Sequence, residues 1–174
     1  MGVQAQARRT PNVTKHKARL VAKGYVQHQG IDYEEVFAPV VGMESVCMLL
    51  AVVAHRAWAV HHMDVKSAFL NGDLAEEVYI QQPQGFITTE HERKMLKLHK
   101  ALYGLWQAPR AWNTKLDASL HMLGFTRSEH EHGLYTHGTE LKRLVVGIYV
   151  DDLIITGESN KEIGAFKEEM KTLF

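Results

Sequence analysis

The chain has 174 residues, 45% of them hydrophobic, which is enough for one domain with an apolar core. Lys plus Arg and Asp plus Glu each number 20, so the net charge does not indicate a nucleic-acid partner. The single Cys47 excludes an internal disulfide, and the longest apolar run, residues 46–54, is too short to span a bilayer. The N-terminus has no apolar stretch, so we expect an intracellular protein without a secretion signal or membrane contact.

Basic residues are concentrated at the N-terminal end. The charged residues before Asp32 are all basic: Arg8, Arg9, Lys15, Lys17, Arg19 and Lys23. Residues 1–14 are predicted to be disordered, and residues 19–26 are predicted to form a strand. This strand is interpreted either as a phosphate-facing element or as a solvated basic segment.

The central part of the chain predicts helices and strands in mixed order. Residues 44–57 are almost entirely apolar, which predicts a helix buried on most sides. Residues 58–63 predict a strand that enters the core and ends at Asp64. Asn71-Gly72 is a strong turn signal, and short β segments are predicted over residues 78–80 and 94–99.

The C-terminal part predicts two further helices around a set of paired strands. Pro109 favours the start of one helix and Gly124 its end. Two strands are then predicted to pair around residues 137–140. Ser159 and Glu162 have the spacing of a capping box, and the apolar stripe that follows consists of Ile163, Phe166, Met170 and Leu173. The mixed order of helices and antiparallel strands favours the α+β class.

Asp151 and Asp152 lie in the middle of an apolar run, residues 144–156, that predicts two strands joined by a tight turn. Asp is a common turn residue, so the pair has a purely structural interpretation. Two adjacent carboxylates also suit Mg²⁺, a hard cation that prefers oxygen ligands. Asp64 favours the second interpretation, because neighbouring strands would bring three carboxylates together. Such a cluster can hold two metal ions about 4 Å apart for attack at phosphorus.

Several sequence blocks resemble a known family. Tyr149-Val-Asp-Asp152 resembles the YxDD motif of reverse transcriptases. Further blocks, in the family's order, resemble the copia-type branch of LTR-retrotransposon reverse transcriptases; they cover residues 17–27, 64–74, 78–86, 102–112 and 124–128. The chain is therefore identified as resembling a fingers–palm fragment of such a Pol polyprotein.

The resemblance implies a polymerase right-hand palm, an antiparallel sheet backed by helices, with fingers elements attached. Within a partial reverse transcriptase domain over residues 15–174, the fingers are expected at 15–40 and 73–107 and the palm at 41–72 and 108–174. More palm, a thumb and an RNase H domain are expected beyond Phe174. A thumb clamps the template–primer duplex through its phosphates, so with the thumb absent we expect weak, poorly processive activity.

The resemblance also assigns roles to individual positions. Asp64, Asp151 and Asp152 would be catalytic and would hold two Mg²⁺ ions, or Mn²⁺ as a substitute, with help from the Val65 backbone carbonyl. The nucleotide-binding residues would be Lys17, Arg19, Val65, Phe69, Tyr103, Gly104, Gln107 and Tyr149. Two positions depart from the family, where Lys and Ser are usual: this chain has Trp106 and Ala108.

Some of these roles have structural alternatives. The ring of Phe69 would clash with a ribonucleotide 2′-hydroxyl and so favour dNTPs; otherwise it is an ordinary core aromatic. Lys17 and Arg19 would grip the triphosphate, or would simply belong to a solvated strand. Tyr149 would pack near the primer end, or would fill the core of the sheet.

The implied reaction is addition of dNMP from dNTP to a primer 3′-hydroxyl on an RNA or DNA template. One alternative is an inactive relic that at most binds nucleic acid. Another is a two-metal nuclease, which would use the same carboxylates without needing Phe69. His130, His132 and His137 match no known zinc-binding spacing, so a zinc site there is disfavoured.

Overall fold

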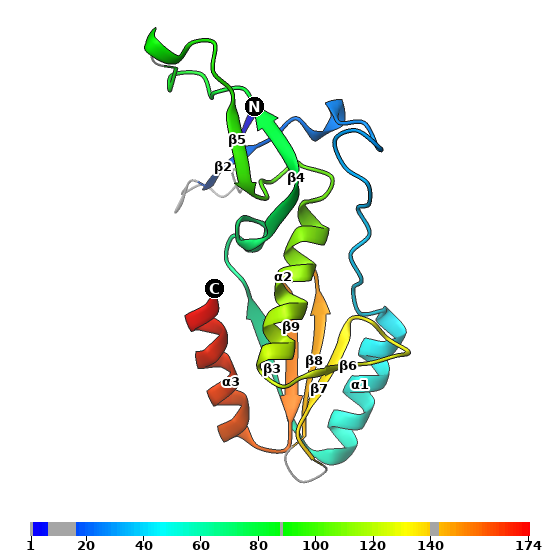
Figure 1. Ribbon diagram of the computed structural model, residues 1–174. Coiled ribbons are helices and arrows are strands. Elements are labelled where there is room, and N and C mark those ends of the chain that lie inside the picture. Colours follow the sequence, from blue (N-terminus) through cyan, green and yellow to red (C-terminus); the bar gives the residue numbers. More distant parts are fainter. Residues whose placement is uncertain (1, 7–16, 88, 140–142) are drawn as a thin grey trace. The chain divides into compact units, whose positions relative to one another are not determined.

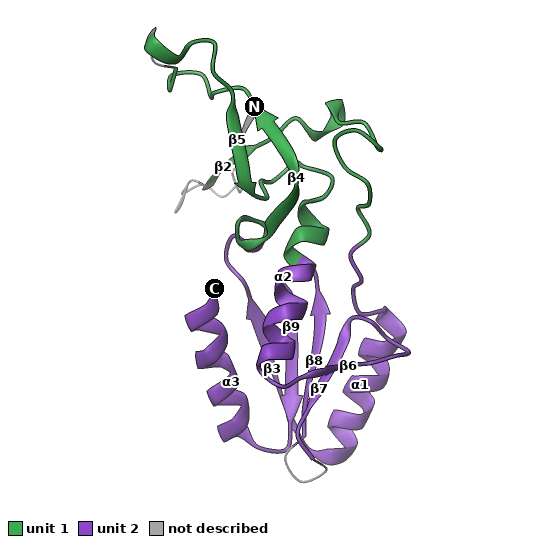
Figure 2. Ribbon diagram, in the orientation of Figure 1, with its two compact units in different colours: residues 1–37, 69–112 green, residues 38–68, 113–174 purple. Residues whose placement is uncertain are grey.

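The computed structural model describes residues 2–6, 17–87, 89–139 and 143–174 (Figure 1). The chain forms two compact units, each built from two separate stretches (Figure 2). Unit 1 comprises residues 1–37 and 69–112, and unit 2 comprises residues 38–68 and 113–174. The assignment of fingers and palm to parts of the chain stays a prediction.

Unit 2 contains a five-stranded sheet in the order β3-β9-β8-β7-β6. All its pairings are antiparallel. The strands are β3 Ala59–Asp64, β6 Thr126–Arg127, β7 Leu134–His137, β8 Leu144–Tyr149 and β9 Asp152–Gly157. The predicted strand ending at Asp64 and the predicted aspartate hairpin are both confirmed. The strands expected around residues 137–140 also pair, although residues 140–142 lie outside the described part of the chain.

Two helices cover one face of this sheet, as the buried contacts of their side chains indicate. Helix α2, Ala108–Met122, begins in unit 1 and ends in unit 2, where its Asp117 accepts a hydrogen bond from the Tyr135 hydroxyl of β7 at 2.5 Å. Helix α3, Asn160–Leu173, packs against β9. Phe166 of α3 also contacts Phe125, just after α2, with ring centroids 4.9 Å apart. The same face of the sheet carries the buried residues Val146, Ile148, Leu153 and Ile155.

The predicted signals at the start and along the face of α3 are largely confirmed. The Ser159 hydroxyl accepts a hydrogen bond from the Glu162 backbone N–H at 3.4 Å, as a capping box requires. Ile163, Phe166 and Met170 are buried, whereas Leu173 is 42% exposed. The apolar stripe therefore holds for all but the last turn.

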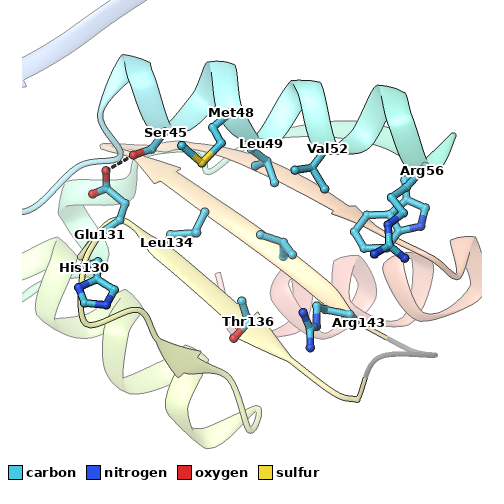
Figure 3. Close-up of a pocket in the computed structure, with 12 residues that line it drawn as sticks. Ser45, Met48, Leu49, Val52, Arg56, His130, Glu131, Leu134, Thr136 and Arg143 are labelled. Carbon is cyan, nitrogen blue, oxygen red and sulfur yellow. Dashed lines mark hydrogen bonds between the residues drawn. The ribbon is translucent and has the colours of Figure 1, made fainter.

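Helix α1, Met43–Arg56, lies on the opposite face of the sheet, and its predicted burial on most sides is wrong. Leu49 and Val53 are buried against Val145, but Met43 and Met48 are 71% and 70% exposed. A single helix on a sheet buries only the strip that faces the strands. A cavity of about 560 Å³ lies beneath α1, between it and the sheet (Figure 3).

The first turn of α1 is fixed by Glu131, from the loop before β7. One oxygen of the Glu131 carboxylate accepts hydrogen bonds from the Gly42 N–H at 3.1 Å and from the Ser45 hydroxyl at 2.6 Å (Figure 3). A negative charge at a helix N-terminus is favourable, because the first N–H groups lack partners within the helix. These hydrogen bonds lower the pKa of Glu131 below its ordinary value, and the bond from Ser45 has the largest effect.

Replacing Glu131 by glutamine is therefore expected to destabilise unit 2, on the order of 1 kcal/mol for a hydrogen-bonded charge of this kind. A lowered pKa in the folded state stabilises the protein above the unfolded-state pKa of about 4.5, and that stabilisation disappears as the pH falls through the folded-state value. The difference in unfolding free energy between wild type and variant, measured by urea denaturation, should thus be full at pH 7 and shrink below pH 4.5. Glu129→Gln, at an exposed neighbouring position, should have no comparable effect. If the difference in unfolding free energy between wild type and Glu131→Gln did not change with pH, the stabilisation of α1 by the charged Glu131 carboxylate would be contradicted.

Unit 1 contains two small antiparallel sheets. Strand β1, Gly2–Gln6, pairs with β2, Lys17–Val21, and β4, Asp73–Ile80, pairs with β5, Leu96–Lys100. Short 3₁₀ helices, η1 Gly24–Val26, η2 Ala68–Asn71 and η3 Thr89–His91, complete the connections. An apolar cluster holds the unit together: Ala22, Val78, Ala101, Leu105 and Ala108.

Unit 1 differs from the sequence-based expectations at three places. Strand β4 covers residues 73–80, whereas a strand was predicted only over residues 78–80. Residues 2–6 form β1 where disorder was predicted, and the remainder of that segment, residues 1 and 7–14, lies outside the described residues. The strand predicted over residues 19–26 ends at Val21 and is followed by η1. Antiparallel sheets combined with helices are compatible with the predicted α+β class. In the part of the chain that the structure describes, no helix has the length and apolarity needed to cross a membrane.

Candidate active site

Two of the three predicted catalytic acids lie directly opposite each other in unit 2. Asp64 is the last residue of β3, Asp152 is the first residue of β9, and the antiparallel register pairs them. Side chains of directly opposed residues leave the same face of the sheet, with Cβ atoms about 4.5–5.5 Å apart. Tyr149 of β8 is also paired with Asp152 and is 57% exposed, so it does not fill the core. The sheet thus presents two carboxylates and an aromatic ring side by side on the face that also carries α1.

The third acid, Asp151, lies in the two-residue turn between β8 and β9. Its backbone carbonyl accepts a hydrogen bond from the Val65 N–H at 3.0 Å, which ties the turn to the end of β3. The other turn residue, Val150, has a φ of 59°, a left-handed conformation that is unfavourable for a β-branched side chain. Such strain persists only where the surroundings enforce it and is common at functional sites. The pairing of β9 with strands on both sides supplies that enforcement here.

His62 belongs to this group of residues, although it was not among the residues predicted for the site. Its Nε2 lies 2.8 Å from Oδ1 of Asp152, and the His62 side chain is 65% exposed. His62 precedes Asp64 by two residues, so strand alternation places both side chains on one face. That alternation was the signal in the sequence that could have found it.

The donor atoms of this group are of the type that Mg²⁺ prefers. Asp64 and Asp152 offer carboxylate oxygens from opposed positions, and the backbone contact with Val65 holds Asp151 beside them. In residue type, the three acids are those that a divalent-cation site uses. Nonetheless, the described residues contain no group of three His, Cys, Asp or Glu side chains arranged to hold a metal ion.

Three of the predicted nucleotide-binding residues contact one another in unit 1. The Arg19 guanidinium carbon lies 5.5 Å from the centre of the Tyr103 ring, within cation–π range. The ring centroids of Tyr103 and Phe69 are 5.0 Å apart. Phe69 is half-buried and packs against the apolar cluster of the unit. For Lys17 the structure describes only the backbone, within β2.

The loop that contains Gly104 approaches the end of β2 very closely. Gly104 has a φ of 90°, and a Cβ atom there would lie 2.3 Å from the Ala22 carbonyl oxygen. Beside it, the Ala22 N–H donates a hydrogen bond to the Tyr103 carbonyl at 2.7 Å. Position 104 therefore requires glycine, and the close approach it permits is to this chain's own backbone.

The side chain of Gln107 is buried and hydrogen-bonded at both ends. Its Nε2 donates to the Asp32 carbonyl at 3.1 Å, and its Oε1 accepts from Gln27 at 3.1 Å. Gln27 in turn accepts a hydrogen bond from the Trp106 backbone N–H. These bonds give Gln107 a structural role within unit 1, and its contact with a nucleotide stays a prediction. Trp106, at a position where the family usually has Lys, is 52% exposed, and Ala108 is buried.

Comparison with known proteins gives a consistent result. Residues 3–174 match the family described as reverse transcriptase (RNA-dependent DNA polymerase). The retrovirus-related Pol polyproteins from transposons RE1 and RE2 of Arabidopsis thaliana are 43% and 42% identical to the chain, each over 84% of its length and 10% of their own. The retrovirus-related Pol polyprotein from transposon TNT 1-94 of Nicotiana tabacum is 38% identical over 93% of the chain and 12% of its own length.

The chain thus spans about a tenth of the length of these curated relatives. No solved structure matches it. The sequence-based resemblance to the Pol polyproteins of copia-type transposons is confirmed, and the chain belongs to the reverse transcriptase family.

Proposed function

We propose that this chain adds dNMP from dNTP to a primer 3′-hydroxyl, directed by an RNA or DNA template. The observation that carries the proposal is the register of β3 and β9, which opposes Asp64 and Asp152 on a chain of the reverse transcriptase family. Asp64, Asp151 and Asp152, with the Val65 backbone carbonyl, would hold two Mg²⁺ or Mn²⁺ ions. When bound, such ions neutralise phosphate charge and lower the pKa of the attacking hydroxyl.

The protein's own groups would then position the reactants. The His62 hydrogen bond fixes the orientation of the Asp152 carboxylate. The exposed ring of Tyr149 offers an apolar surface beside Asp152 for the primer end. The ring of Tyr103 holds the Arg19 guanidinium, whose planar fork of donors matches the oxygens of a triphosphate. Lys17, on the same strand, would add a second cation.

Phe69 would select deoxyribonucleotides over ribonucleotides. Replacement by valine removes the ring that would meet a 2′-hydroxyl, so incorporation of rNMP relative to dNMP is expected to rise about 10–100-fold, the range typical of discrimination by pocket shape. The measurement is the ratio of kcat/KM for UTP and dTTP. Phe86→Val, at a position that is 78% exposed, is the matched control and should leave the ratio unchanged. An unchanged ratio in Phe69→Val would assign the ring to the core of unit 1 alone.

Primer extension tests the proposal directly. Purified chain is incubated with oligo(dT) annealed to poly(rA), labelled dTTP and Mg²⁺, and product length is followed on a gel. Incorporation that stops when EDTA is added supports the polymerase. Strand cleavage without dNTP would instead identify a nuclease.

The second candidate is a chain that binds nucleic acid without catalysis. One observation favours it: the three acids, all among the described residues, do not form a three-ligand group in this structure. Template–primer binding without incorporation, in Mg²⁺ or in Mn²⁺, would decide for this candidate.

A further inference from the structure

The cavity between α1 and the sheet of unit 2 is separate from the proposed catalytic acids. Its volume of about 560 Å³ is within the range of about 300–1,000 Å³ that is usual for small-molecule sites. Helix α1 and Trp58 form one wall, and β7, the loop before it and the beginning of β8 form the other. All the lining residues belong to unit 2, and the acids at 64, 151 and 152 are not among them.

The middle of the cavity is apolar. Leu49 of α1 and Val145 of β8 are 9% and 7% exposed and belong to one buried cluster. Met48 and Val52 of α1 also line the cavity, yet they are 70% and 45% exposed. Side chains that line a void lack the dispersion contacts that a closely packed neighbour would supply. An apolar group that entered the cavity would supply those contacts and would shield Met48 and Val52 from water.

The charged side chains of the cavity lie at its two ends. Figure 3 shows Glu131 and His130 with Ser45 at one end, and Arg56 and Arg143 at the other. Glu131 is the one acid among the lining residues that the structure describes. Its carboxylate already accepts hydrogen bonds from the Ser45 hydroxyl and from two backbone N–H groups. The negative charge of the cavity is therefore engaged within the protein.

The two arginines are not engaged in this way. Within residues 2–6, 17–87, 89–139 and 143–174, neither Arg56 nor Arg143 forms an ion pair. Arg56 is the last residue of α1 and Arg143 directly precedes β8, so two separate segments bring cations to one end of the cavity. A guanidinium group can donate parallel hydrogen bonds to both oxygens of a carboxylate. This end of the cavity is therefore suited to an anion.

We propose that this cavity binds a small amphiphilic anion of the fatty-acid type, with its carboxylate on Arg56 and Arg143 and its apolar chain over Leu49 and Val145. Both parts of the ligand are needed. A neutral apolar molecule would leave the two cations without a partner, and an inorganic anion would leave the apolar walls in water. The site goes beyond the proposed function, because its ligand is neither a nucleotide nor a nucleic acid.

The test measures binding of radiolabelled decanoate to the full chain by equilibrium dialysis. 1-Decanol has the same chain without the charge, and acetate has the charge without the chain. Hydrogen bonds to charged groups contribute enough that decanoate should bind about tenfold more tightly than 1-decanol. Acetate should not compete with decanoate, because it buries almost no apolar surface.

Variants then locate the site. Arg56→Gln and Arg143→Gln should each weaken decanoate binding about tenfold and leave 1-decanol binding unchanged. Arg93→Gln removes the same charge at an exposed position of unit 1, and this matched control should keep the wild-type affinity. Val52→Trp fills the cavity without altering its charge, so it should weaken the binding of both decanoate and 1-decanol. Thermal unfolding of each variant verifies the fold.

The proposal would be overturned if wild type did not bind decanoate, or bound decanoate and 1-decanol equally. Wild-type affinity for decanoate in both arginine variants, or in Val52→Trp, would also overturn it. A chain that failed to bind decanoate and eluted from size-exclusion chromatography as a dimer, which Val52→Trp dissociated, would assign the cavity to a contact between two copies instead. The dialysis contains no dNTP, template or metal ion, so its result and that of primer extension are independent of each other.

Discussion

Asp151→Asn is expected to reduce dNMP incorporation by about 10³-fold or more while leaving the fold intact. Asparagine keeps the size of the side chain and the backbone carbonyl that accepts the Val65 hydrogen bond, so only the negative charge is lost. A preorganised electrostatic contact contributes about 10²–10³ in rate, and a group that binds the cations directly should contribute at least as much. Asp64→Asn should have an effect of the same order, because Asp64 opposes Asp152 across the strand pair.

The measurement is the single-turnover rate of primer extension, with the urea midpoint of each variant as the test of folding. Glu158→Gln is the control, because it removes an exposed acid just beyond the other end of β9. Its rate should stay within about twofold of wild type, as expected for a surface change remote from the acids. If Asp151→Asn retained the wild-type rate, the acids at 64, 151 and 152 would not form the active site.

Phe166→Ala is expected to lower the free energy of unfolding by about 3–5 kcal/mol, the range for deleting a buried aromatic side chain. Phe166 is 2% exposed, and its ring meets that of Phe125 between α3 and the segment after α2. A typical domain is stable by only about 5–15 kcal/mol, so this loss is a large share of the total.

Urea denaturation followed by circular dichroism measures the effect. Phe86→Ala makes the same chemical change at a site that is 78% exposed, and should alter the stability by less than about 0.5 kcal/mol. If Phe166→Ala and Phe86→Ala changed the free energy of unfolding equally, the Phe125–Phe166 contact would not stabilise the packing of α3 in unit 2.

The elements that were predicted well are those whose pattern is local. The apolar character of residues 58–63 predicted β3, and β-branched and aromatic residues predicted the aspartate hairpin. The cap and stripe of α3 were visible in the spacing of Ser159, Glu162, Ile163 and Phe166. The end of β2 was not predictable in this way. A Cβ atom on Gly24 would lie 1.8 Å from the Gly104 carbonyl oxygen, so a contact with a residue far along the chain determines the local structure there.

The same distinction between local patterns and long-range contacts applies to the candidate site. The motifs pointed to Asp64 and to the pair at 151–152, and strand pairing then explains why Asp64 and Asp152 are neighbours. The sequence did not indicate the contact of His62 with Asp152, nor that Lys167 shares a pocket with Asp64. Strand alternation places His62 on the face of Asp64, but its contact with Asp152 depends on the pairing of two distant strands. The approach of α3 to the sheet edge has no periodic signature in the sequence.

The pairing of β3 with β9 also governs when the acids can meet during synthesis on the ribosome. His62 and Asp152 are hydrogen-bonded although 90 positions separate them, and the stretches between them contribute to both units. Contacts at such separation form late, because the closure of a long loop precedes any gain from the contact. The nascent chain therefore carries β3 without its partner strand until β9 has emerged, and Asp64 and Asp152 can lie opposite each other only after β9 pairs with β3.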